Sequence, residues 1–470
     1  MKILYALLLG GVLTILDLIF LKIFQLENYK IKKYIKNILN FNFSIGAKNN
    51  LKYTKRVQRA ILFNFIFNFF IFLFIFIFSQ KIWLKIVTIL SVFLLCPMLE
   101  ALVFLCLTPI ETMIKNGYIR KAKRKLKSFG GKKIAITGSY GKTSTKNILY
   151  QILKTEFDVC ATPKSFNTPM GVCKTILEDL KETDDFFIVE MGARKSGDIE
   201  FLSKFVGVDF GIITPIGNCH LETFGSVEKI EDTKYELCQN SAGAVVFNGK
   251  SKSSKKLYDR FERKKYLVCE QGSFAFAHSV KSNKNGSTFV LNIDKFEIKC
   301  QTNLLGSANI DNIVVAAAMA YLLGVSLLGI QKAIKNLTPI PHRLELIKGY
   351  VNVIDDSYNS NFDGFCEALT VLSTFSGKRV VVSPGIVELG KEQEKVNRSV
   401  AALVAKNADH FVIMNETNRK SLLLGAIDGG MKRENIYFAK TRKEQQEILK
   451  SILSKGDCVL FENDFPDNLK

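Results

Sequence analysis

Lys142 and Thr143 are the clearest candidates for chemistry in this 470-residue sequence, because a glycine-containing turn stands directly before them. The stretch TGSYGKTS places Gly138, Ser139 and Gly141 between an apolar run and a helix-forming segment. Glycines let backbone N–H groups approach phosphate oxygens, the helix N-terminus adds partial positive charge, and a lysine reaches the terminal phosphates. A threonine after the lysine offers a hydroxyl to Mg²⁺. The stretch therefore predicts a site for nucleotide phosphates.

This motif is shorter than the common pattern G-x-x-x-x-G-K-[ST], because Ile136 stands where that pattern has its first glycine. The run Ile134 to Ile136 predicts a buried strand, and the residues from Lys142 onward predict a helix with an apolar face. The alternative interpretation is a tight strand-to-helix turn with a solvated lysine.

Further polar residues follow buried strands later in the chain. Glu190 ends the apolar run FFIVE, a position at which a metal ligand or a water-positioning acid follows a phosphate loop. His220 comes after the run FGIITP, and Lys234 lies in a charged helical pattern beyond it. Taken alone, Glu190 is equally compatible with an acid in a surface turn. A lone histidine is more often a structural residue, and a lone lysine is more often solvated.

Asparagine, arginine and aspartate residues complete the set of candidates. Asn309 and Asn312 lie three residues apart in a predicted helix, so both side chains can face one way. Arg343 in PHRLEL and Asp356 in VNVIDD stand near a predicted domain boundary. They would clamp a nucleotide when two domains close, or they would form an ion pair between the domains.

The basic charge of the sequence is concentrated in two segments. Of the net +21, residues 25–59 contribute +8 and residues 115–133 contribute +9. Both segments flank strongly apolar runs, as basic loops do beside membrane helices. The charge balance therefore indicates a membrane surface and argues against a nucleic-acid partner.

Three apolar runs predict helices that cross a membrane. They are Leu4–Leu21, Ala60–Phe78 and Ile82–Leu107, and the second has 19 residues without a charge. At about 1.5 Å per residue, 19 residues span roughly 28 Å, close to the ~30 Å hydrocarbon core of a bilayer. If both basic segments are cytosolic, the N-terminus is outside and everything after about residue 108 is cytosolic. A signal peptide over residues 1–24 is the alternative for the first run, but no small-x-small cleavage site follows it.

From Lys132 onward, short β-rich runs alternate with helical patterns, which predicts α/β domains with mainly parallel sheets. Two prolines in NLTPIPHR, followed by the strand-like VNVID, predict a domain boundary within 336–341. Ten cysteines without a C-x-x-C pair predict free thiols in a reducing compartment. The predicted parts are a membrane module over 1–128, a central domain over 129–338 and a C-terminal domain over 339–470.

Taken together, these motifs resemble the Mur ligases, the ATP-dependent amide-bond-forming enzymes of peptidoglycan synthesis. The resemblance is carried by TGSYGKTS, VEMGARKSGDIEFLS, IGNCHLETFGSVEKIEDTKYEL, GSANIDNIVVAAAMA, PHRLEL and IDDSYNSN, in this order over residues 132–365. The second and third motifs most resemble the branch that adds D-alanyl-D-alanine to UDP-N-acetylmuramoyl-tripeptide. The resemblance implies a P-loop central ATPase domain, a Rossmann-like C-terminal domain and an acyl-phosphate intermediate.

Carried over residue by residue, the resemblance gives the phosphate and metal sites. The phosphates of ATP would be bound by Gly138, Ser139, Gly141, Lys142, Thr143 and Ser144. Thr143 and Glu190 would hold a first Mg²⁺, and His220 would serve a second. Lys234 would be the family's carbamylated lysine, in which CO₂ converts a cation into an anion that supports a metal. The catalytic set would be Lys142, Glu190, His220 and Lys234.

The resemblance also implies where the nucleoside and the substrates bind. Asn309 or Asn312 would contact adenine, and Arg343 and Asp356 would reach the nucleotide from the C-terminal domain. The substrate side would be formed by Asn167, Asn359 and Asn361, the last two near the incoming dipeptide. Together with the basic segments, the resemblance implies that the protein lies in a bacterial cytoplasmic membrane. Its N-terminal part would contact the lipid, and its catalytic domains would lie in the cytosol.

Two departures from the family pattern leave other functions open. Family members begin with a soluble domain that binds the UDP-sugar, whereas this chain has about 128 residues of apolar runs and basic loop at that place. The C-terminal stretches VSPGIVELGKEQEKVNRS and LFENDFPDNL differ from the commonest form of the branch. The alternatives are a related ligase that acts on a lipid-linked or modified cell-wall acid, and a membrane transport or signalling NTPase. An inactive nucleotide domain on a membrane anchor would predict loss of Lys142, Glu190 or His220, and all three are present.

Overall fold

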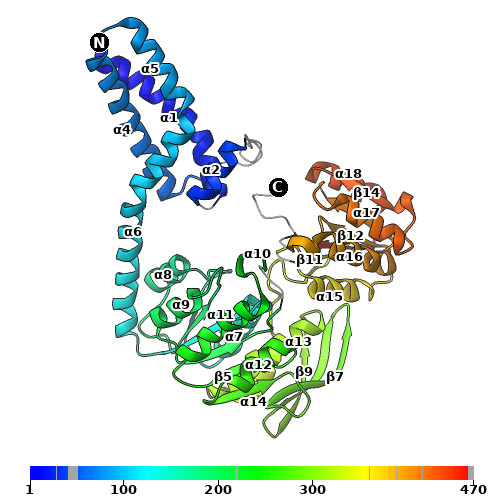
Figure 1. The fold of residues 1–470 in the computed structure, drawn as a ribbon. Coiled ribbons are helices and arrows are strands. Elements are labelled where there is room, and N and C mark those ends of the chain that lie inside the picture. The colour runs from blue at the N-terminus through cyan, green and yellow to red at the C-terminus, as the bar shows by residue number, and fades with distance from the viewer. Residues whose placement is uncertain are drawn as a thin grey trace. The chain divides into compact units, whose positions relative to one another are not determined.

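The computed structural model consists of two compact units, Met1–Tyr118 and Ile119–Asp464. The structure describes residues 1–27, 29–40, 51–217, 221–358, 360–387, 389–414 and 416–463. In Figure 1 the colour follows the chain from the blue apolar helices through a green sheet to a second sheet in orange and red.

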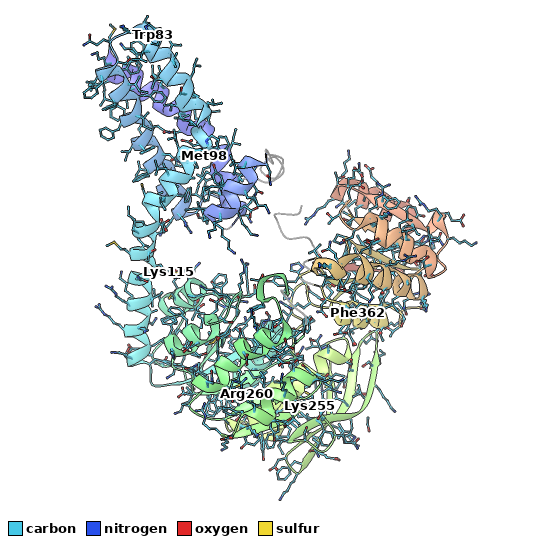
Figure 2. The ribbon with its side chains drawn as sticks, viewed as in Figure 1. Trp83, Met98, Lys115, Lys255, Arg260 and Phe362 are labelled. Carbon is cyan, nitrogen blue, oxygen red and sulfur yellow. The ribbon has the colours of Figure 1, made fainter. Side chains whose placement is uncertain are left out.

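Helices make up the N-terminal unit, most of them apolar. They are α1 (Lys2–Leu26), α2 (Ile31–Leu39), α4 (Lys55–Phe78), α5 (Ile82–Leu94) and the first part of α6 (Cys96–Ser128). Among the described residues, α1, α4 and α6 are long and apolar enough to cross a membrane. Many large apolar side chains on these helices face outward, and Trp83 of α5, labelled in Figure 2, is 59% exposed. An apolar surface of this extent marks a contact with a membrane or with another protein.

The third predicted crossing, Ile82–Leu107, is not a single helix. It divides at Leu95 into α5 and α6, and Pro97 stands in the first turn of α6. A proline has no backbone N–H and disfavours helical geometry in the residue before it, so one helix ends there and another begins. With 13 residues, α5 is about 20 Å long, which is short for a bilayer.

Polar side chains connect three helices inside the N-terminal unit. Asn68 of α4 donates to Asp17 of α1 at 2.7 Å, and Asn64 of α4 donates to Glu100 of α6 at 2.8 Å. The Cys96 thiol also donates to Asp17, at 2.9 Å. The polar residues that interrupt the apolar runs are therefore buried contacts between helices. In lipid, hydrogen bonds of this kind stabilise helix packing by about 0.6 kcal/mol each on average.

A nine-stranded sheet forms the central part of the second unit. Its strands are β1 (Lys132–Thr137), β2 (Val159–Ala161), β3 (Phe186–Glu190), β4 (Phe210–Ile213), β5 (Val245–Asn248), β6 (Lys265–Val268), β7 (Ala275–Asn283), β8 (Gly286–Ile293) and β9 (Phe296–Thr302). They lie in the order β2-β3-β1-β4-β5-β6-β7-β8-β9. Pairing is parallel up to β7 and antiparallel from β7 to β9. The predicted α/β fold is confirmed, and the antiparallel extension is a feature that the sequence analysis did not predict.

Helices cover both faces of this sheet (Figure 1). One face carries α7 (Lys142–Leu153), α13 (Ser307–Leu322) and α14 (Leu327–Lys335). The other carries α8 (Pro169–Glu178), α9 (Asp198–Val206), α11 (Val227–Asn240), α12 (Lys252–Arg260) and the end of α6, and the short α10 (Leu221–Phe224) precedes α11. Ile134 and Ile136 of β1 pack on the first group, and Ala135 packs on the second. Because both faces are buried, the strands are continuous apolar runs.

A six-stranded sheet follows. Its strands are β10 (Glu345–Ile347), β11 (Asn352–Asp356), β12 (Arg379–Ser383), β13 (His410–Met414), β14 (Ile436–Ala439) and β15 (Cys458–Glu462), in the order β10-β11-β15-β12-β13-β14. Only β10 pairs antiparallel among these described strands. One face carries α15 (Phe362–Leu372), α16 (Gln393–Asn407) and α17 (Arg419–Asp428), and the other carries α18 (Arg442–Ile452). Since β15 is inserted between β11 and β12, this last strand of the described residues ends beside Asp356.

Candidate active site at the phosphate loop

The predicted phosphate loop connects β1 to α7, and its backbone requires glycine at two positions. Gly141 precedes α7 with a φ of 73°, and a Cβ there would lie 2.5 Å from Asn312 Oδ1. Gly138 has a φ of 150°, and a Cβ there would lie 2.0 Å from Thr214 Oγ1. The first N–H groups of α7 have no partner within the helix, so they are available to an anion at this loop.

Lys142 begins α7 and folds back over the loop. Its Nζ donates to Gly138 O at 2.9 Å and to Ser139 O at 2.8 Å. Ser139 Oγ donates in turn to Gly217 O at 3.1 Å, and Ser144 is buried in the first turn of α7. Phosphate oxygens in the loop would be stronger acceptors for the ammonium group than these carbonyls, because they are charged.

Thr143 and Glu190 meet at the carboxyl edge of the parallel strands. Because β3 pairs with β1, Glu190 lies beside Ile136 at the start of the loop. Thr143 Oγ1 donates to Glu190 Oε2 at 2.8 Å, and Asn167 Nδ2 donates to Glu190 Oε1 at 3.0 Å. Glu190 is only 1% exposed. A hydroxyl and a carboxylate suit Mg²⁺, which binds one or two protein groups together with water and phosphate oxygens, so the residues present fit this ion.

Arg343 reaches this pair from the segment before β10. Its Nη2 donates to Thr143 Oγ1 at 3.2 Å, and its guanidinium lies 4.5 Å from the centre of the Tyr358 ring. The next residue, Leu344, donates its N–H to Asp356 Oδ1 at 3.1 Å. The fold therefore brings a cation from beyond the predicted boundary to the hydroxyl that contacts Glu190.

Lys146 belongs to this site, although the sequence analysis did not single it out. It is buried, with Nζ 3.7 Å from Glu190 Oε2, and it donates to Thr162 O at 2.6 Å and also to Lys164 O. Thr162 Oγ1 accepts from the Glu190 N–H at 3.1 Å, so one residue contacts both sides of the pair. Burial lowers the pKa of Lys146 to about 8, against the opposing effect of Glu190.

A sequence signal for Lys146 exists. The residue lies three positions before Leu149 and seven before Leu153, on the buried face of α7. Residues at this spacing share one face of a helix, and Lys146 is the one charged residue among the buried residues of α7. A lysine at a core position needs a buried partner, and Glu190, at the end of an apolar strand, is a carboxylate that can supply it.

The two asparagines of α13 have different environments. Asn312 is buried and accepts from Thr145 Oγ1 at 3.2 Å, which links α13 to α7 beside the loop. Asn309 Nδ2 donates to Leu305 O at 2.9 Å, one turn earlier in the chain. Asn361 precedes α15 and accepts from Gly364 N at 3.0 Å, as a helix cap, immediately before Phe362, which is labelled in Figure 2.

Lys234 lies in α11 and is buried, on the same face as Ile230 and Leu237. His220 and Asn359, the other predicted site residues, lie outside the described residues.

Two protein-family models match this chain. The model described as "Mur ligase middle domain" matches residues 136–320, and the model described as "Mur ligase, glutamate ligase domain" matches residues 342–462. The first match takes in the phosphate loop and Glu190, and the second takes in Arg343.

Curated relatives include UDP-N-acetylmuramoyl-tripeptide–D-alanyl-D-alanine ligases of several bacteria. The chain is 26% identical to the Bacillus subtilis protein over 346 residues, which are 72% of this chain and 74% of that protein. It is 31% identical to the Buchnera aphidicola subsp. Baizongia pistaciae protein over 264 residues, which are 55% of this chain and 57% of that protein.

Solved structures share the fold. MurF from Acinetobacter baumannii superposes with a TM-score of 0.68 at 25% identity, over 74% of this chain and 78% of that chain. MurF from Thermotoga maritima, solved in complex with ADP, has a TM-score of 0.67 at 24% identity, over 74% of this chain and 80% of that chain.

Replacing Lys146 by methionine tests whether its cation supports Glu190. The substitution keeps the length of the side chain but removes the buried cation beside the Glu190 carboxylate. Removing one partner of a buried ion pair lowers the free energy of unfolding by roughly 3–5 kcal/mol. We expect a lower unfolding temperature and an affinity for Mg²⁺–ADP at least tenfold weaker, measured by thermal unfolding and by titration.

Lys174→Met in α8 is the matched control, because this lysine is 57% exposed and forms a surface ion pair with Glu178. The control should change neither quantity measurably. Wild-type nucleotide affinity in Lys146→Met would contradict the role given to Lys146.

Proposed function

The chain belongs to the Mur ligase family, and from this premise we propose that it joins D-alanyl-D-alanine to UDP-N-acetylmuramoyl-tripeptide with ATP, in peptidoglycan precursor synthesis. The observation that carries the proposal is the contact of Thr143 with both Glu190 and Arg343 at the phosphate loop. Curated relatives with the corresponding name support the choice of substrates. The matched segments span 57% to 74% of those two relatives.

The residues of the central domain would act on the phosphates of ATP. Lys142 would exchange the loop carbonyls for phosphate oxygens, and Thr143 with Glu190 would hold Mg²⁺. Bound there, the ion would offset negative charge while a substrate carboxylate attacks the γ-phosphate to give an acyl phosphate. Lys146 would keep Glu190 and the segment after β2 in place.

The residues of the C-terminal domain would complete the site from the other side. Arg343 already contacts Thr143, and Glu367 of α15 accepts hydrogen bonds from the backbone N–H and the hydroxyl of Ser307 at the start of α13. These contacts would exclude water from an acyl phosphate while the amine of the dipeptide attacks it. Asp356 would support Arg343 near the nucleotide.

Several assignments rest on the family resemblance and are part of the proposal. Asn309 or Asn312 would contact adenine, and Asn167, Asn359 and Asn361 would lie toward the substrates. His220 would serve a second Mg²⁺, and Lys234 would be carbamylated. Lys234 is buried in α11, and its assignment rests on the motif in which it stands.

We also propose that the chain has three functional parts, of which the first attaches it to a membrane. They are a membrane module over 1–128, a central ATP-binding domain over 129–338 and a Rossmann-like C-terminal domain over 339–470. The basic segments 25–59 and 115–133 would face anionic lipid on the cytosolic side, with the N-terminus outside. The three long apolar helices support this arrangement.

A related ligase that acts on a lipid-linked or modified cell-wall acid is the second candidate. It is favoured by one observation, which is that apolar helices precede the ligase domains in the same chain.

The reaction can be tested with the detergent-solubilised full-length protein, UDP-N-acetylmuramoyl-tripeptide, D-alanyl-D-alanine, ATP and Mg²⁺. We expect a pentapeptide product by mass spectrometry, and a loss of at least 100-fold in Lys142→Ala, because charge stabilisation by one such group is worth about 3–4 kcal/mol. Lys154→Ala, at the other end of α7, is the control and should keep the activity. ADP release only after addition of a lipid extract, without this product, would favour the lipid-linked acid.

The membrane attachment can be tested by fractionating cells that produce the full-length chain. We expect it to stay with the membranes after an alkaline carbonate wash and to need detergent for release, because apolar helices of this length partition into lipid. An N-terminal epitope tag should be accessible to antibody on spheroplasts. Recovery of the chain in the soluble fraction would contradict the proposal.

A further inference from the structure

Two carboxyl groups meet at the carboxyl edge of the C-terminal sheet. Asp356 ends β11 and Glu462 ends β15, and the parallel pairing places these two residues side by side. Paired residues of adjacent strands point to the same face and lie about 5 Å apart. The two carboxyl groups are within hydrogen-bonding range of each other, and Glu462 is wholly buried, at 0% exposure.

The groups around Glu462 satisfy only one of its oxygens. Ser360 Oγ donates to Oε1 at 2.5 Å. Oε2 accepts from no N–H or O–H group among the described residues, and Glu462 as a whole lies beside the Asp356 carboxyl. Two carboxylates in contact in a buried site cannot both be ionised, because they repel each other and neither is solvated. One proton between them removes the repulsion and gives Oε2 a partner.

Among the described residues, three further titratable or charged groups act electrostatically on the pair. Arg343 faces Asp356 and favours its charged form, whereas Asp355 on the same strand disfavours it. Cys366 faces Glu462 from α15. Burial raises the pKa of Asp356, partly offset by the Leu344 N–H and Arg343, and burial together with the charge of Asp356 holds the pKa of Glu462 well above its usual value.

We propose that Asp356 and Glu462 share a single proton in the folded protein, carried mainly by Glu462, so that the one negative charge of the pair lies on Asp356 and faces Arg343. Glu462 is then a positioning residue, because it acts by donating a hydrogen bond to Asp356. Asp356 also accepts from the N–H of Leu344, next to Arg343, whose guanidinium contacts Thr143. The effect on nucleotide binding rests on the proposed function, whereas the shared proton does not.

The first test is the pH dependence of unfolding, measured on the detergent-solubilised full-length protein. In the folded chain Glu462 keeps its proton above the pH of about 4.3 at which an unfolded glutamate releases it. Stability from this proton is complete at low pH and is lost as the pH rises toward the folded pKa. Glu462→Gln retains a donor and binds no such proton. We therefore expect the unfolding temperature of the wild type to fall relative to that of Glu462→Gln between pH 5 and pH 8.

A difference in unfolding temperature that is constant over this range would overturn the proposal. Asp356→Asn is the second variant, for the case that Glu462→Gln does not fold. It removes the neighbouring charge that retains the proton, so the fall of its unfolding temperature with pH should be smaller than in the wild type. An unchanged pH dependence would again overturn the proposal. Asp409→Asn is the control, because it breaks an ion pair with Arg379 at the amino ends of β12 and β13. The pH dependence of its unfolding temperature should match that of the wild type between pH 5 and pH 8.

The second test is the affinity for Mg²⁺–ADP at pH 7. Glu462→Leu offers no donor to Asp356, and we expect it to lose at least tenfold more affinity than Glu462→Gln. Equal losses in the two variants would show that a donor at this position does not matter, and they would overturn the positioning role. If the wild type binds no ADP, the proposed function fails, and the unfolding test still decides whether the proton is shared.

Discussion

The burial of the Glu190 carboxylate is the constraint on which the site depends. A charge removed from water must be paired and hydrogen-bonded, or it is expelled or neutralised. Glu190 has Thr143 and Asn167 as donors and Lys146 as the nearby cation. These three come from the helix that follows the phosphate loop and from the segment that precedes α8. The loop, the helix and the substrate-side segment are therefore held in one arrangement by a single carboxylate.

The same rule explains how the two ligase domains meet. The hydroxyl that donates to Glu190 accepts from Arg343, which lies 200 residues further along the chain. Arg343 is followed by Leu344, which donates to Asp356, and Asp356 lies against Glu462. Charged groups thus alternate in sign from Glu190 through Arg343 to Asp356. A change at one of these groups alters the electrostatic environment of the next. In this way Asp356 and Glu462 would act on the phosphate loop through Arg343.

Buried polar groups in the apolar N-terminal unit also need hydrogen-bond partners. Asp17 and Glu100 lie on helices that could cross a membrane, and each accepts a hydrogen bond from an asparagine of α4. Without water, a side chain of this kind must be satisfied by other protein groups, and contacts between helices of this kind specify which helices pack together. The family matches begin after this unit, at residue 136, so the ligase domains and the helices have separate structural roles within one chain.

The local elements and the kind of chemistry could be predicted from sequence patterns. The strand up to Ile136, the loop and the helix from Lys142 are set by apolar periodicity and glycine, and motif order indicated the ligase family. Which residues meet could not be predicted, because strand order and register depend on contacts between distant segments. Pairing of β3 with β1 brought Glu190 to the loop, and insertion of β15 beside β11 brought Glu462 to Asp356. Three further features were not predicted: the burial of Lys146, the division of the third apolar run, and the antiparallel pairing of β7, β8 and β9. Each depends on packing as well as on local sequence pattern.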